Sequence, residues 1–199
     1  GTGYLFDFGA FPDKFAIGNI WMLVVLGIVI GLASVGFNYV IINSQKIIPK
    51  KIPQWAKLIF AFLLCCGVGL ALVDTVGGGH SLIMNIGNGN FVWWMLLVIL
   101  LVKLILIPIS VNSGATGGLF IPMLTIGALI GGLFGNLFQL AGLDTTLFKL
   151  LIVISMSALF GASVRTPVTA MVLVMEVTGS FHSFLFTGIT IFIATLVAE

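Results

Sequence analysis

The sequence carries very little charge. Its 199 residues include only eight Lys and Arg and six Asp and Glu, so that 7% of the chain is charged while 60% is hydrophobic. Ordinary globular domains have about a quarter charged residues. The mean hydropathy is +1.27. Because several uncharged stretches reach the roughly 20 apolar residues that a spanning helix needs, the composition indicates an integral, multi-pass membrane protein embedded in a lipid bilayer.

The chain also lacks the residue clusters of metal sites and enzymes. Cys65 and Cys66 are adjacent in an apolar run, so we expect small buried side chains and neither a disulfide nor a metal site. His80 and His182 are isolated, and neither HExxH nor GxSxG occurs. An intramembrane enzyme would need a nucleophile with its base, or metal ligands, on facing helices. The sequence therefore predicts no enzyme, no catalytic residue, no metal and no cofactor.

The few basic residues gather in one connection. Lys46, Lys50, Lys51 and Lys57 lie within residues 45–57. By the positive-inside rule this loop is cytoplasmic, whereas simple interfacial anchoring would explain the same lysines without giving an orientation. The net charge of +2 gives no reason to expect nucleic acid as a partner. We expect a plasma or inner membrane. The chain begins at Gly1 without an initiator methionine or a signal-peptide pattern, so we expect part of a longer protein.

Apolar runs, separated by glycine, proline and polar clusters, predict an all-α membrane protein. The predicted helices cover residues 20–44, 54–73, 81–86, 91–109, 120–141, 147–162, 167–176 and 184–198. The third of these is far too short to span a bilayer. Broken and short helices beside long ones are typical of transporters and channels that place irregular backbone at membrane depth. Glycines at helical spacing predict close helix packing, at Gly27, Gly31, Gly36, Gly127, Gly131, Gly132 and Gly135.

The most informative break lies at residues 112–122, where glycines and small polar residues lead to Pro122. Proline fits the first turn of a helix, so a helix is predicted to start near Phe120. A helix N-terminus has unpaired N–H groups and about half a positive charge, which suits an anion. Gly117 and Gly118 permit a positive φ and a close approach of an ion to the backbone. A glycine–proline kink in a spanning helix explains the same residues, and both interpretations stay open on the residues alone.

Several motifs together resemble one family. Gly118-Leu119-Phe120-Ile121-Pro122 resembles the GxFxP motif of the CLC family of chloride channels and anion/proton exchangers. Further segments resemble the second half of that family in the same order, namely residues 77–79 before a short helix, 113–115, 163–167 and 171–178. The resemblance covers nearly the whole chain, and the ordered set is much more specific than GxFxP alone.

The resemblance implies a fold of two inverted repeats that meet at a midplane anion site and assemble as a homodimer. Residues 1–199 resemble the second repeat without its last helix, a partial transmembrane domain. The implied function is permeation of chloride or a similar monovalent anion, by a channel or by an anion/proton antiporter. The implied partners are a missing N-terminal half of the same protein and a second copy. A cation-coupled secondary transporter of another broken-helix fold is the alternative, although intramembrane carboxylates are scarce.

Within the resemblance, the anion site consists of the backbone amides around Gly118, Leu119, Phe120 and Ile121. No position matches the family's GSGxP serine, its GxEGP gating glutamate, its internal proton-transfer glutamate or its last-helix tyrosine. Lys103 lies inside a long apolar helix. It either extends to the membrane surface or raises the positive potential at a pore mouth, as a basic residue of the family does.

Other polar residues have more ordinary interpretations. Arg165 and Glu176 are expected to pair or to cap helices. Ser113 and Thr116 either line the pore or cap the following helix. The helices at 167–176 and 184–198 resemble the family's subunit contact, with Ile193 among the residues expected to face the second copy.

Overall fold

The computed structural model describes residues 20–47, 53–71, 79–89, 91–113, 118–140, 147–178 and 184–199. These residues form eight helices and, within the described ranges, no strand. The helices are α1 (Ile20–Ile47), α2 (Gln54–Ala71), α3 (His80–Gly87), α4 (Trp93–Asn112), α5 (Phe120–Leu140), α6 (Phe148–Val164), α7 (Pro167–Thr178) and α8 (Phe184–Val197). The predicted all-α class and the order of elements are confirmed.

Five helices, α1, α3, α4, α6 and α7, end one to three residues beyond their predicted ends, and the structure gives a reason for α4 and α6. α4 contains Pro108, which has no N–H and therefore removes one helical bond. The helix nevertheless continues to Asn112, whose side chain donates to the Pro108 carbonyl at 2.8 Å. α6 ends only at Val164, because Arg165 takes the left-handed conformation at φ 59° and the Thr166 N–H donates to the Gly161 carbonyl at 3.2 Å.

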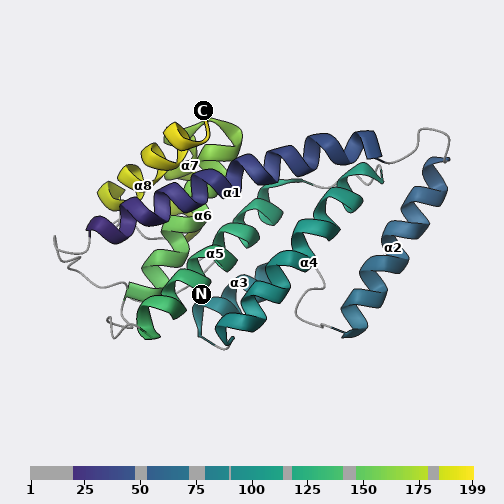
Figure 1. Cartoon of the computed structure of the whole chain (residues 1–199), viewed down its shortest axis with the longest axis horizontal. Helices are drawn as coiled ribbons and strands as arrows, with labels where there is room; N and C mark the ends of the chain where they lie inside the picture. The colour runs from purple at the N-terminus through teal and green to yellow at the C-terminus, as the bar shows by residue number, and fades with distance from the viewer. Residues whose placement is uncertain are drawn as a thin grey trace.

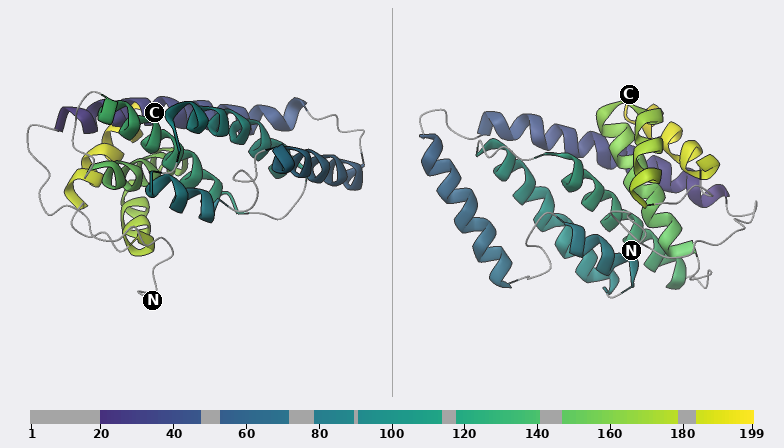
Figure 2. Two further views of the ribbon diagram at one scale, coloured as in Figure 1. Left: turned by 90° about the horizontal axis from the view of Figure 1, so that it is seen from below. Right: turned by 180° about the vertical axis from the view of Figure 1, so that it is seen from behind.

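α6 is the centre of the bundle. Most of its residues are buried, and it packs against α1, α5, α7 and α8 (Figure 1). α1 lies along one side, and α7 projects from the opposite side (Figure 2). α2 lies at the edge, where it packs on α4 (Figure 1). A helix enclosed on all sides must be apolar around its whole circumference, as α6 is.

Glycine allows the closest contact, between α5 and α6. A Cβ at Gly127 would lie 2.7 Å from the Met156 Cα, and one at Gly131 would lie 2.8 Å from the Ile152 Cα. Gly132 and Gly135 are similarly close to the side chains of α3, α4 and α6. The predicted packing role of these glycines is confirmed, because the two backbones approach where side chains are absent.

The glycines of α1 have mixed outcomes. Gly27 and Gly31 face α8, where a Cβ would meet Ile193 and Val197. The packing prediction is therefore right for both. It is wrong for Gly36, which has nothing within 4 Å of an added Cβ.

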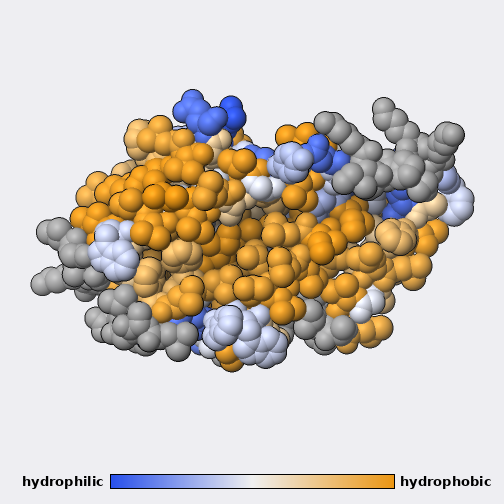
Figure 3. Space-filling model, in the orientation of Figure 1, coloured by the Kyte–Doolittle hydropathy of each residue, from blue (hydrophilic) through white to orange (hydrophobic). Residues whose placement is uncertain are grey.

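The surface fits a membrane protein. α1, α4 and α5 contain segments long and apolar enough to cross a bilayer, by length and composition. Figure 3 shows hydrophobic residues over most of one face, with hydrophilic residues toward the edges. Large apolar side chains such as Leu32, Phe62 and Leu70 are exposed. Soluble monomers rarely expose such extended apolar areas, so lipid or other protein covers these faces.

The cysteine prediction needs a correction. Both cysteines are free, but Cys65 is only partly buried and Cys66 is exposed. The reason is the edge position of α2, which leaves most of its circumference open.

Candidate functional site

The start of α5 presents backbone donors without helical acceptors. The first helical bond joins the Met123 N–H to the Leu119 carbonyl at 3.0 Å. The N–H groups of Leu119, Phe120 and Ile121 precede that bond, and none donates to a backbone carbonyl of the residues that the structure describes. Pro122 has no N–H and ends the row. Residues 114–117, including Thr116 and Gly117, lie outside the described residues.

Gly118 borders open space. It is exposed, and nothing lies within 4 Å of where its Cβ would be. Its backbone is not left-handed; among the described glycines a positive φ occurs at Gly79 and Gly89. Gly118 therefore does not use the positive φ that glycine permits. Its contribution is the absent side chain, which leaves the approach to the following amides clear.

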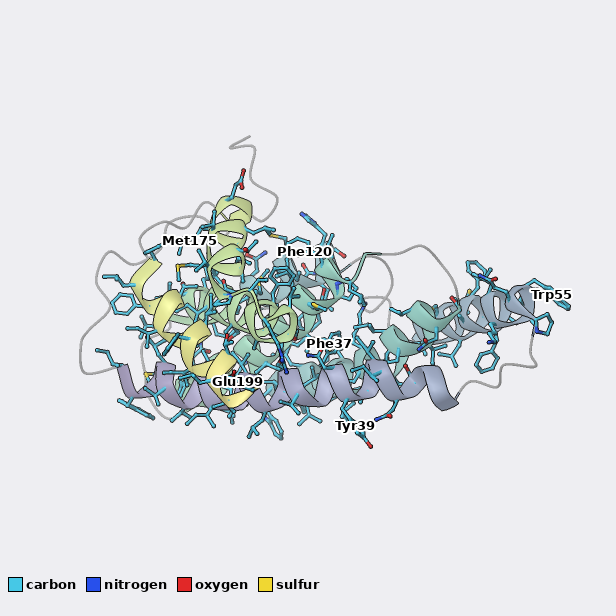
Figure 4. The ribbon with its side chains drawn as sticks, turned by 90° about the horizontal axis from the view of Figure 1, so that it is seen from above. Phe37, Tyr39, Trp55, Phe120, Met175 and Glu199 are labelled. Atoms are coloured by element: carbon cyan, nitrogen blue, oxygen red, sulfur yellow. The ribbon has the colours of Figure 1, made fainter. Side chains whose placement is uncertain are left out.

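Phe120 anchors the start of α5 to the centre of the bundle. Its ring meets that of Phe160 on α6 edge to face, with centroids 5.1 Å apart and planes at 84°. Figure 4 shows Phe120 on the side of the bundle away from α1. Leu119, Phe120 and Ile121 are all half-buried. Because partial burial lowers the local dielectric constant, a charge placed here interacts more strongly with the helix dipole than at a fully exposed surface.

Lys103 lies on the packed face of α4. It is 9% exposed and shares that face with Leu96, Ile99 and Leu106. Nine or more residues separate it from either end of the helix, which is about 14 Å along the axis. A four-carbon side chain does not reach that far, so its position disfavours the membrane-surface interpretation. α4 packs directly against α5, the helix that begins at the amides of the candidate site.

The remaining polar predictions have separate outcomes. Arg165 ends α6 by its backbone conformation, while its side chain is exposed. Glu176 is exposed on α7, nine residues after Pro167. Helical rise places it about 14 Å along the axis from the start of α7, so the expected pairing with Arg165 is wrong. The buried Ser113 donates to the Ser110 carbonyl at 2.7 Å. This bond closes the end of α4 and does not cap α5.

The prediction that Ile193 faces a second copy is also wrong. Its Cγ2 would lie 3.0 Å from a Cβ at Gly27 of α1, so Ile193 packs within the chain. The exposed stripe of α8 consists of Leu185, Ile189, Phe192 and Leu196.

Three hydrogen bonds of polar side chains were not predicted from the sequence. On α1, Ser34 bonds the Ser163 hydroxyl at 3.0 Å, and the Asn38 amide donates to the Ser163 carbonyl at 3.1 Å. On α5, Thr125 donates to the Ile121 carbonyl at 2.9 Å. Polar side chains in apolar helices were the available signal, because such groups are costly without a partner.

His80 opens α3 and is exposed, whereas His182 lies outside the described residues. Within the described ranges, no three His, Cys, Asp or Glu side chains come together. In the part of the chain that the structure describes, the start of α5 therefore offers backbone donors for binding.

Comparison with known proteins gives consistent matches. The profile of the family described as "Voltage gated chloride channel" matches residues 1–199. A protein named H(+)/Cl(-) exchange transporter ClcA from Yersinia pestis is 36% identical over 209 residues, covering 100% of this chain and 43% of the relative. Its namesake from Klebsiella pneumoniae is 36% identical over 193 residues, covering 92% and 40%. The chain thus spans less than half the length of these curated relatives.

Two solved structures have the same fold. A slow cyanobacterial Cl-/H+ antiporter superposes with a TM-score of 0.86 at 25% identity, covering 100% of this chain and 47% of that one. A CLC-type fluoride/proton antiporter has a TM-score of 0.79 at 20% identity, covering 98% and 47%. The second similarity concerns the fold alone.

Proposed function

Because this chain belongs to the CLC, or voltage gated chloride channel, family, we propose that it forms one half of a membrane domain that conducts chloride or a similar monovalent anion. The relatives named as chloride/proton exchangers support this function. The proposal covers both proton-coupled exchange and passive conduction through a channel. The alternative of a cation-coupled transporter with another fold is wrong, since both the family and the fold are those of CLC proteins.

The N–H groups of Leu119, Phe120 and Ile121, which donate to no backbone carbonyl of the described residues, carry the proposal. An anion that enters beside Gly118 loses part of its hydration and gains these N–H groups and the positive end of the α5 dipole. Such a site has no full positive charge. It therefore binds an anion well enough to admit it and weakly enough to release it, which conduction requires. Lys103, one helix away, adds long-range positive potential that concentrates anions at the pore mouth.

The site is incomplete in this proposal. The chain spans 43% of the Yersinia relative, so we assign the other side of the ion cradle to an N-terminal half of the same protein. That half would supply further donors and the titratable groups that couple protons. Residues 1–199 then correspond to the second inverted repeat without its last helix.

We further propose a homodimer with α7 and α8 at the contact. The exposed stripe of α8 supports it, because Leu185, Ile189, Phe192 and Leu196 form a continuous apolar strip on the outside of the chain. On α7, Val168 and Val172 are exposed in the same way. We also propose a plasma or inner membrane, with the basic connection at residues 45–57 on the cytoplasmic side.

A structure of the full-length protein in bromide tests the site. We expect anomalous density about 3–3.5 Å from the three amides, a hydrogen-bonding distance for a large halide. Donation by these amides to carbonyls of residues 112–116 would instead indicate an ordinary kinked helix and overturn the assignment.

Flux measurements test the incomplete cradle and the ion. Full-length protein in liposomes with chloride as the only permeant ion should carry saturable current or flux. Residues 1–199 alone should carry none, because the donors that we assign to the N-terminal half are missing. Saturable, chloride-selective flux through residues 1–199 would contradict the proposed division of the site.

A further inference from the structure

The short helix α3 contacts α5 where Gly79 lies against Thr125. This contact leaves no room for a side chain at position 79. Gly79 precedes α3 and has a φ of 93°, a conformation that favours glycine. A Cβ built there would overlap the Thr125 hydroxyl oxygen and lie 3.2 Å from the Thr125 Cβ. Both the backbone conformation and the space therefore require glycine at this position.

Thr125 connects this contact to the start of α5. Its side chain is 1% exposed, and its hydroxyl donates to the Ile121 carbonyl at 2.9 Å. Ile121 is the last of the three residues whose N–H groups lack a described acceptor. Gly79, Thr125 and Ile121 thus form one chain of contacts from α3 to the first turn of α5.

The other end of α3 also rests on α5. The Ile86 Cγ2 would lie 2.7 Å from a Cβ at Gly132, two turns beyond Thr125. Leu82 and Ile83, between these two ends, are buried. Because α3 contacts α5 at both places, it restrains the direction of the α5 axis as well as the position of its first turn.

We propose that Gly79 and Thr125 are positioning residues for the anion site, with α3 as the support that directs the first turn of α5 toward the ion. The inference rests on the proposed function. An ion–dipole interaction depends on both distance and angle, so a small displacement of the first turn weakens all three N–H contacts together. Neither residue touches the ion, and their effect is exerted through the backbone.

Gly79→Ala in the full-length protein is the first test, with Gly89→Ala as its matched control. Gly89 follows the other end of α3 and has a φ of 73°, but nothing lies within 4 Å of its added Cβ. Both substitutions strain the backbone, and only the first displaces Thr125. We expect chloride affinity, measured by titration calorimetry in detergent, to fall about three- to tenfold in Gly79→Ala, the range of a helix-terminus interaction. Gly89→Ala should bind chloride as the unaltered protein does.

A second pair of variants keeps the test decisive if Gly79→Ala does not fold. Thr125→Val removes the hydroxyl bond to Ile121 while keeping the side-chain volume. Thr190→Val removes the equivalent bond in α8, where the buried Thr190 donates to the Phe186 carbonyl at 3.0 Å. A general loss of stability would affect both alike. We expect weaker chloride binding, again about threefold or more, only in Thr125→Val.

The outcomes separate the two proposals. If the unaltered full-length protein binds no chloride, the proposed function fails and the positioning role fails with it. If it binds chloride, but Gly79→Ala matches Gly89→Ala and Thr125→Val matches Thr190→Val in affinity, the positioning role alone is refuted.

Discussion

The contact between α5 and α6 makes a sharp prediction at Gly127. An added Cβ would lie 2.7 Å from the Met156 Cα, 2.8 Å from the Ser155 carbonyl oxygen and 3.0 Å from the Met156 N. All three atoms belong to the backbone of α6, so no side chain can rotate away to make room. Gly127→Ala therefore forces the two helices apart by about 0.7–1 Å to restore ordinary contact distances.

The expected cost follows from two opposing effects. Overpacking of a close-packed interior costs about 1–3 kcal/mol. Replacing glycine by alanine within a helix stabilises it by about 0.5–1 kcal/mol. The balance is a net loss of about 0.5–2 kcal/mol, or a melting temperature lower by about 1–8 °C for a domain of about 200 residues and by less for a longer protein.

Thermal unfolding of the full-length protein in detergent provides the assay, with Gly36→Ala as the control. Gly36 also lies within a helix, but nothing is within 4 Å of its added Cβ. Gly36→Ala should leave the melting temperature unchanged or raise it, because only the helix effect remains. If Gly127→Ala melts no lower than Gly36→Ala, the close backbone contact between α5 and α6 is refuted.

Three further predictions concern the subunit contact, the α1–α6 bonds and the buried lysine. Ile189→Trp on the exposed stripe of α8 should make the protein monomeric in detergent, as measured by light scattering, whereas an intact dimer would place the contact elsewhere. Ile193→Trp should instead lower the yield of folded protein. Asn38→Ala removes the bond to the Ser163 carbonyl and should destabilise the protein by about 1 kcal/mol in thermal unfolding, and an unchanged melting temperature would refute this bond's role. Lys103→Gln should raise the chloride concentration at which flux is half-maximal, measured at low ionic strength, whereas Lys103→Arg should leave it unchanged. Equal values in the two variants would contradict the electrostatic role of Lys103.

Much of this protein could be predicted locally. Low charge and long apolar runs determine the membrane class, because a polar backbone in lipid must satisfy its hydrogen bonds within helices. Pro122 and Pro167 predicted helix starts at the right places, since proline lacks only an N–H that a first turn does not use. The candidate anion site follows from the same local chemistry together with its family motif.

Only the tertiary structure determines which side of each helix packs against the rest of the protein. Leu or Ile is equally suitable against lipid and against protein, so helices that are apolar all round carry no signal for which side is packed. This is why Ile193 was expected outside but packs on Gly27, and why Gly36 was expected inside but is open. The contact between Gly79 and Thr125 joins residues 46 positions apart by number. Only folding brings them together, because neither residue's neighbours in the sequence indicate the other.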